Sequence, residues 1–233
     1  MAGLLTSLST TKTDAVASFE NEHYILLELF TSQGCSSCPP ADRVLKRLKA
    51  DAEQGDLSVV ALSYHVDYWN RLGWKDPYSQ KAFSERQYTY ADKLGDNRVY
   101  TPELVINGTS GHIGSRELEI RNKIQKISKG LNYTTFEVAF DQNSKGISYQ
   151  FDKAPADMLL QVALVQPVVA NEVPRGENTG RRLEHVQVVD QLITVESPNQ
   201  IGQVELASYS KDQEVIVFLQ DKNTWAIRGV QKL

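Results

Sequence analysis

The chain has two cysteines, and their spacing suits redox chemistry. Two residues separate Cys35 from Cys38, and the pair lies after an apolar run and before a segment with helical periodicity. Backbone N–H groups and the dipole at a helix N-terminus stabilise a thiolate, so we expect the pKa of Cys35 to fall below about 8.5. Cys38 can then resolve a mixed disulfide formed at Cys35. The pair predicts a thiol–disulfide oxidoreductase whose sulfur atoms bond reversibly and are exposed enough to meet another molecule.

Two ionisable side chains are candidates for moving protons at the cysteines. Glu28 lies on a buried strand just upstream, where burial should raise its pKa; the alternative is an ion pair with a lysine or arginine. His65 ends a second strand at the same predicted sheet edge. It could act as a base, could join Cys35 and Cys38 as a third ligand of copper or zinc, or could be a loop histidine without a role.

Substrate contacts are predicted around an X-Pro bond and two tryptophans. Thr101 and Pro102 come directly before a strand, and a cis peptide bond there would present the backbone of Thr101 to an extended substrate. An ordinary trans proline that starts a strand is the alternative. Trp69 and Trp74 could line the cysteine cleft, although packing beneath a long loop explains them nearly as well.

A polar loop at 173–185 is a further candidate for the site. Arg181 and His185 could close over the cysteines, hold an anionic substrate, or lower the pKa of a thiol. A solvated hairpin with internal ion pairs is the alternative.

The elements that must position these residues fall into two parts. Apolar strands at 24–30 and 57–64 flank a helix at about 41–52, which predicts a parallel pair with a right-handed crossover. A strand at 103–106 then enters a two-residue hairpin at Asn107-Gly108, and a helix follows at about 118–127. The result is an α/β unit of order βαβαββα over 23–130, with an aromatic-rich helical insertion at about 65–99.

After residue 131 the hydrophobic period changes to two. We therefore expect an all-β, sandwich-like unit at 131–233 packed on the first unit, so that the whole chain is of the α+β class. Residues 1–22 are rich in serine and threonine and are expected to form a flexible leader.

Composition excludes several classes of partner. The 233 residues include 25 Lys plus Arg against 29 Asp plus Glu, so the net charge of −4 offers no basic surface for nucleic acid. No apolar run approaches the roughly 18 residues that cross a bilayer. We predict a protein or a small thiol or disulfide as substrate, and no cofactor. The N-terminus leaves the compartment open, because Ala15-Val16-Ala17 resembles a signal cleavage site but no typical apolar stretch precedes it.

Five sequence blocks carry a resemblance to a known family. They are LFTSQGCSSCPPAD at 29–42, HVDYW at 65–69, GWKDP at 73–77, YTP at 100–102 and GENTGRRLEH at 176–185. The chain resembles the bacterial family called domain of unknown function 1223 and, more broadly, thioredoxin-like proteins. The resemblance implies a thioredoxin-like N-terminal unit with an attached β unit, often in exported proteins, and it supplies no substrate. Ser36 and Ser37 stand where thioredoxins have Gly-Pro, a difference that bears on the redox potential.

Two other functions compete with the redox interpretation. A metal handler would use Cys35, Cys38 and His65 to bind copper or zinc. A catalytically silent scaffold would keep the fold and bind a partner through its β unit.

Overall fold

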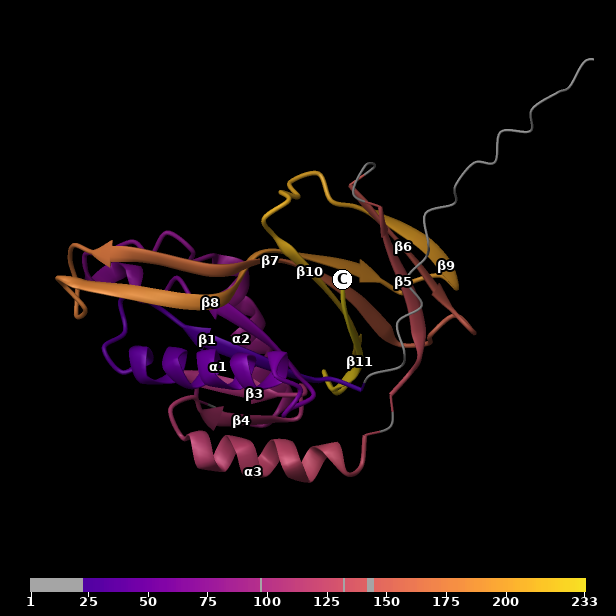
Figure 1. Ribbon diagram of the computed structural model, residues 1–233, viewed down its shortest axis with the longest axis horizontal. Coiled ribbons are helices and arrows are strands. Elements are labelled where there is room, and N and C mark those ends of the chain that lie inside the picture. The colour runs from indigo at the N-terminus through magenta and orange to yellow at the C-terminus, as the bar shows by residue number, and fades with distance from the viewer. Residues whose placement is uncertain (1–22, 97, 132, 142–144) are drawn as a thin grey trace, which may run out of the picture.

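The computed structural model describes residues 23–96, 98–131, 133–141 and 145–233 (Figure 1). The predicted leader at 1–22 lies outside the described residues. The strands are β1 (Ile25–Thr31), β2 (Val59–His65), β3 (Glu103–Ile106), β4 (Ser110–Ile113), β5 (Phe136–Asp141), β6 (Gly146–Phe151), β7 (Met158–Val173), β8 (Arg181–Glu196), β9 (Ile201–Glu205), β10 (Glu214–Asp221) and β11 (Ile227–Lys232). The helices are α1 (Cys38–Glu53), η1 (Asn70–Leu72), α2 (Lys81–Lys93) and α3 (Glu117–Ser128).

One mixed eight-stranded sheet organises the described part of the chain. Its order is β11-β10-β7-β8-β2-β1-β3-β4, and a smaller sheet has the order β5-β6-β9. Strands β1 and β2 are parallel, as the sequence predicts, while β3 runs antiparallel to β1. Because α1 connects β1 to β2, the cysteines at its start lie at the carboxyl edge of the parallel pair.

The central strand β1 is buried along its whole length, which explains its nearly continuous apolar sequence. Leu27 and Leu29 pack toward α1 and α3, whereas Leu26 and Phe30 pack on the opposite face with residues of α2. This alternation fixes which side chains of the strand can approach the cysteine helix. Glu28 lies two residues from both Leu26 and Phe30, so its side chain is on the same face of the sheet as theirs and points away from α1.

The second half of the chain extends the same sheet. Strand β8 pairs in parallel with β2 through Ser63 and Val188, and β7, β10 and β11 continue from it. The small sheet packs on this extension, with Ile147 and Phe151 in one core cluster with Val162 and other residues of the large sheet. The mixed α/β composition expected from the sequence is confirmed, but the large sheet runs across the expected boundary at residue 131.

The strands β7 and β8 form a hairpin of unusual length. Each has 16 residues, and the pairing runs from Leu159 with Glu196 to Val173 with Arg181. One end of the hairpin covers the small sheet, while its turn reaches the start of α1 on the other side of the molecule (Figure 1). A register shift at Leu164 and Val165 interrupts the ladder between these two ends.

A buried ion pair lies on the face of the sheet opposite α1. Arg86 of α2 contacts Glu28 at 2.6 Å, and both side chains are almost completely buried. Tyr90 donates a hydrogen bond to the other carboxylate oxygen of Glu28, and Gln220 accepts one from Arg86. The pair therefore has hydrogen-bonding partners that compensate part of the cost of burying two charges.

We predict that Arg86→Met destabilises the protein by about 3–5 kcal/mol, because it leaves the Glu28 carboxylate buried without its cation. The double variant Glu28→Leu/Arg86→Met should recover most of the loss, since no charge then remains in the core. Urea unfolding measures both effects. Lys81→Met is the matched control on the same helix, because Lys81 pairs with Glu85 in solvent and its loss should leave the stability nearly unchanged. If the stability loss of the double variant equals the sum of the losses of Glu28→Leu and Arg86→Met, the prediction is contradicted.

Candidate redox site

Cys35 and Cys38 form a disulfide at the start of α1, with their Cα atoms 5.4 Å apart. Cys38 is the first residue of the helix, and its N–H donates to the carbonyl of Cys35 at 3.2 Å. Pro39 and Pro40 follow, so Cys38 and Ala41 are the only residues among the first four of the helix that carry an N–H. The helix start therefore offers fewer backbone donors to a thiolate than the sequence argument assumes.

Both cysteines are fully buried, which corrects the expectation that the sulfur atoms are exposed. Ser36 and Ser37 between them are exposed, so the loop itself is at the surface while its sulfur atoms face inward. Another molecule can reach the disulfide only after a covering group has moved.

The turn of the β7–β8 hairpin covers the cysteine loop. Asn178 is completely buried and donates to the carbonyl oxygens of Gln33 and Cys35, both at 2.9 Å. Glu177 accepts a hydrogen bond from the N–H of Ser36 at 3.0 Å, and hydrogen bonding from Ser36 lowers the pKa of Glu177. We call Glu177 and Asn178 the hairpin latch. The sequence placed this loop over the cysteines as one of two alternatives, and the structure places it there through these two residues.

Thr101 and Pro102 lie on another side of the cysteine loop. The peptide bond between them is cis, as predicted from the sequence. Ser37 donates to the carbonyl oxygen of Thr101 at 3.4 Å, and its hydroxyl is 3.3 Å from Sγ of Cys35. The hydroxyl of Ser37 thus lies between the carbonyl oxygen of Thr101 and the sulfur of Cys35 and contacts both.

The two predicted tryptophans contact the residues around the site. The indole N–H of Trp69 donates to Oγ1 of Thr101 at 2.7 Å, and that of Trp74 donates to the Gln33 side chain at 3.1 Å. A Cβ atom at Gly34 would lie 3.0 Å from Cβ of Trp69, so the chain passes close to the Cβ and backbone of Trp69 just before Cys35. Both rings are partly buried and fix the loop segments that hold Thr101 and Gln33.

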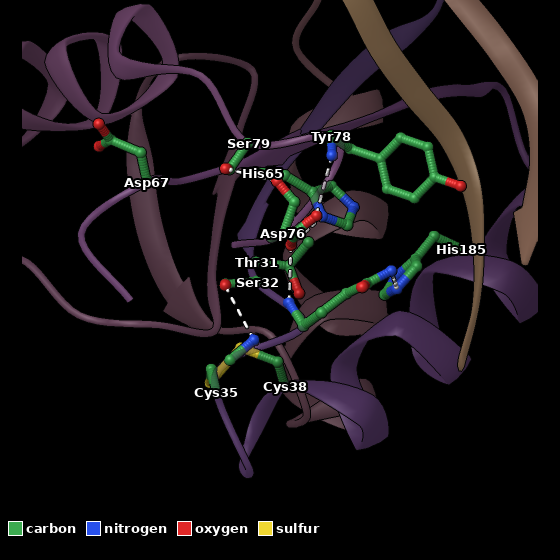
Figure 2. A network of polar contacts seen from close by, with 12 residues as sticks. Thr31, Ser32, Cys35, Cys38, His65, Asp67, Asp76, Tyr78, Ser79 and His185 are labelled. Carbon is green, nitrogen blue, oxygen red and sulfur yellow. Dashed lines mark hydrogen bonds and ion pairs between the residues drawn. A yellow bond between two sulfur atoms is a disulfide. The ribbon is translucent and has the colours of Figure 1, made fainter. Parts of the chain in front are cut away.

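A buried polar cluster lies behind the cysteine loop (Figure 2). Nδ1 of His65 is 2.7 Å from Oδ2 of Asp76, and the same oxygen accepts the N–H of Gln33 at 2.8 Å. Burial alone would raise the pKa of Asp76, but the attraction of His65 and the N–H donors outweigh it, so the pKa is lowered. Nε2 of His65 has no hydrogen-bond partner among the described residues and is buried within them.

His185 joins this cluster from β8. Its ring is edge-on to that of His65, with centroids 4.5 Å apart, and its Nδ1 is 3.5 Å from Oδ2 of Asp42 in α1. Burial opposes protonation of His185, but the carboxylates of Asp42 and Asp76 outweigh it and raise its pKa. Thus His185 is not a surface residue of the loop but part of the buried polar cluster.

Other predicted site residues lie elsewhere. Glu28 is bound to Arg86 on the face of the sheet away from α1, so the ion-pair alternative holds and the structure gives it no contact with either cysteine. Arg181 donates to the side-chain oxygen of Asn178 at 3.1 Å and so supports the hairpin latch. Asp67, next to His65 in sequence, accepts a hydrogen bond from Ser84 and points away from the cluster (Figure 2).

The described residues do not bring together a metal-binding set of the predicted kind. His65 is engaged with Asp76, the two sulfur atoms are bonded to each other, and no group of three or more Cys, His, Asp or Glu side chains in this part of the chain is arranged around a common point. Nor does any helix within the described ranges have the length and apolar character that crossing a membrane requires.

Sequence reasoning missed the residues that connect these parts. Gln33 exchanges two hydrogen bonds with the side chain of Asn171, at 2.6 and 3.1 Å, and so joins the cysteine loop to β7. Asp42 receives a hydrogen bond from Thr31 at 2.9 Å. The one available signal was the spacing of Asp42, which follows Cys38 by a single helical turn and so must share its face.

The comparisons with known proteins agree with this fold. The family model described as a protein of unknown function, DUF1223, matches residues 26–220, and the chain belongs to this family. A crystal structure of a protein from Agrobacterium tumefaciens is 31% identical, covers 92% of this chain and 96% of its own, and has a TM-score of 0.73. HBP35 of Porphyromonas gingivalis is 14% identical over 92% of this chain and 76% of its own, with a TM-score of 0.60, so it is similar in fold alone. No curated protein matches the chain.

A buried acid follows the cis proline directly. Glu103 faces α2, where its carboxylate accepts a hydrogen bond from Gln87 at 2.7 Å, and burial raises its pKa to about 7. An acid whose pKa is raised in the folded state favours folding in its protonated form. Its contribution is fully present below the unfolded pKa of about 4.5 and is lost as the pH rises through about 7.

We therefore predict that the effect of Glu103→Gln on the free energy of unfolding is more favourable at pH 8 than at pH 4, by up to roughly 3 kcal/mol. The reason is that glutamine keeps the hydrogen bond from Gln87 without the buried charge. Urea unfolding of the variant and the natural protein across this pH range gives the difference. Glu119→Gln is the control at the surface, where His112 lowers the pKa of Glu119, so its difference should have the opposite sign. If the difference in unfolding free energy between Glu103→Gln and the natural protein does not change with pH, the raised pKa of Glu103 is contradicted.

Proposed function

We propose that the protein is a thiol–disulfide oxidoreductase with a thioredoxin-like N-terminal part, in which Cys35 is the attacking and Cys38 the resolving residue. The observation that carries the proposal is the Cys35–Cys38 disulfide at the first residue of α1, directly after the central strand of the sheet. A disulfide with three-residue sequence separation closes a small loop and adds little to chain stability through loop entropy, so a structural role explains it poorly.

The arrangement of elements around the disulfide supports the thioredoxin-like assignment. Strands β2, β1, β3 and β4 are neighbours in that order, with the first two parallel and the others antiparallel, and α1 and α3 pack on one face. Pro102 begins this β3–β4 hairpin beside Ser37 of the cysteine loop. These are the features that the family resemblance leads one to expect.

The reaction exchanges two electrons between two pairs of sulfur atoms. The thiolate of reduced Cys35 attacks one sulfur of a substrate disulfide, the substrate S–S bond breaks, and the second substrate sulfur leaves as a thiolate with the bonding electron pair. Cys38 then loses its proton and attacks Sγ of Cys35, so the first substrate sulfur leaves in turn. The enzyme ends with the Cys35–Cys38 disulfide and the substrate as a dithiol; the reverse sequence oxidises a dithiol substrate.

Two groups are placed to handle the substrate near Cys35. The Thr101 carbonyl accepts a bond from Ser37, and its backbone lies along the exposed side of the loop, where an extended polypeptide can pair with it. The hairpin latch occupies backbone groups of the loop on the other side. Access to the sulfur atoms therefore requires that Glu177 and Asn178 release the loop, and the substrate takes their place.

Replacing the resolving cysteine should trap the natural substrate. In Cys38→Ala the mixed disulfide at Cys35 has no internal thiol to break it, so covalent adducts accumulate and dissolve on reduction. Non-reducing electrophoresis followed by mass spectrometry measures them. Cys35→Ala/Cys38→Ala is the matched control without a nucleophile. If Cys38→Ala yields no more adducts than this control, and the purified protein exchanges no disulfides with a model dithiol, the proposed function is wrong.

Loosening the hairpin latch should speed reduction of the disulfide. Asn178→Ala removes two hydrogen bonds to buried carbonyls, each worth about 1 kcal/mol, so the open population and the rate of reduction by a neutral dithiol should rise roughly tenfold or more. Stopped-flow kinetics measures the rate. Arg175→Ala changes an exposed neighbour on the same turn and should leave the rate unchanged. Equal rates for the two variants would show that the hairpin does not limit access.

A further inference from the structure

The resolving step needs a proton acceptor close to Cys38, inside a site closed to solvent. Glu28 is held by Arg86 on the other face of the sheet, and Nδ1 of His65 is held by Asp76. We propose that the carboxylate of Asp42, oriented by Thr31 and His185, accepts the proton of the Cys38 thiol and returns it when the disulfide is reduced. This inference rests on the proposed function and names a residue for one of its steps.

Helix geometry places Asp42 beside Cys38. The two residues are one turn apart on α1, and both are buried on the same face. Side chains on a helix lean toward its N-terminus, so the carboxylate of Asp42 extends over the turn that contains Cys38. A buried carboxylate at this position needs compensation, because an isolated charge in the core is costly.

The partners of Asp42 leave one oxygen available. Oδ1 accepts the hydroxyl of Thr31 at 2.9 Å, whereas Oδ2 accepts no hydrogen bond from the described residues and has the ring of His185 at 3.5 Å. Nδ1 of His185 likewise has no hydrogen-bond partner. Nε2 of the same ring is 3.4 Å from the side-chain nitrogen of Gln33, which precedes Cys35 by two residues. Thr31 and His185 are thus positioning residues: Thr31 binds Oδ1, and Nδ1 of His185 faces Oδ2 at a distance longer than a normal hydrogen bond, which leaves room for a proton on Oδ2.

The charges that face His185 come from several elements. Asp42 lies on α1, Asp76 on the segment before α2, and Glu184 next to it on β8, and all three carboxylates raise its pKa. His65 of β2 and Tyr78 face it with their rings. When His185 is protonated, its charge balances that of the Asp42 carboxylate 3.5 Å away.

Asp42 also has a path to solvent that avoids the disulfide. A cavity of about 270 Å³ opens between α1 and β8, and Asp42 forms part of its wall. The other lining residues are Pro39, Arg43, Lys46, Arg182, Leu183 and Glu184. A proton that reaches Asp42 from Cys38 can pass to water in this cavity while the bound substrate, in the place of the hairpin latch, keeps bulk solvent from the sulfur atoms.

The step balances as follows. In the mixed disulfide between Cys35 and a substrate sulfur, the Cys38 S–H bond breaks and its proton moves to Oδ2 of Asp42. The Cys38 sulfur bonds to Sγ of Cys35, and the substrate sulfur leaves as a thiolate with the electrons of the broken bond. Asp42 then releases the proton to solvent. Reduction of the disulfide runs through the same steps in reverse, with Asp42 as the acid.

One experiment separates this step from the attack of Cys35. The reduced protein is mixed with dithiobis(nitrobenzoate), which releases one coloured arylthiolate when Cys35 attacks and a second when Cys38 closes the disulfide. For Asp42→Asn we expect an unchanged first release and a second release slowed at least about a hundredfold at neutral pH, the lower end of general-base contributions. The slowed rate should rise about tenfold per pH unit and approach that of the natural protein once Cys38 ionises unaided. His185→Gln should give a smaller decrease.

The controls keep the test independent of folding. Asp51→Asn alters another aspartate of α1, paired with Arg121 at the far end of the helix, and should leave both releases unchanged. In Asp42→Ala, formate entering from the cavity should restore part of the second release. Equal second releases in Asp42→Asn and Asp51→Asn overturn the inference, as does a slowed release that neither formate nor high pH restores. Absence of the first release in the natural protein overturns the proposed function instead.

Discussion

The hydrogen bonds that satisfy the buried backbone around the cysteines are the constraint on which the site depends. The loop leaves β1 and turns into a helix whose first turn is depleted of N–H groups, so its peptide groups satisfy each other only in part. Asp76 binds the N–H of Gln33, Asn178 binds two carbonyls, and Glu177 binds the N–H of Ser36. Each of these side chains comes from a distant segment of the chain, and leaving the buried carbonyl oxygen of Gln33 unsatisfied would cost about 1–3 kcal/mol.

This dependence explains why the second half of the chain extends the first sheet instead of forming a detached unit. The latch can reach the loop only if the β7–β8 hairpin is placed accurately, and the pairing of β8 with β2 beside the parallel pair provides that placement. The same strand carries His185 into the cluster behind the loop. One hairpin therefore supplies both the cover of the disulfide and a residue of the buried polar cluster.

The sequence predicted those elements well whose form depends on neighbouring residues, such as β3 and the turn that follows it. The bounds of β3 agree with the sequence prediction, and Asn107 and Gly108 both adopt positive φ in the following turn. The turn has three residues between the paired Ile106 and Ser110, one more than predicted. Residues that adopt positive φ occur in three-residue hairpin loops as well as in two-residue loops, so the Asn-Gly pair does not fix the loop length. Within the helical insertion predicted at about 65–99, α2 begins only at Lys81, since the preceding residues are held in turns by Asp76.

Long-range partners could not be predicted in the same way. The partner of Glu28 lies 58 residues away on a helix whose apolar pattern gives no register relative to β1, and Asn178 lies 143 residues from Cys35. A cysteine motif in the sequence also says nothing about whether its sulfur atoms are covered. For the proposed oxidoreductase, burial of the disulfide sets a requirement that an open redox site lacks: a substrate must offer backbone or side-chain groups that replace those of Glu177 and Asn178. Selectivity then arises from the competition between substrate and hairpin for the same peptide groups, so a small neutral thiol that cannot make these bonds reacts only through the minor open population.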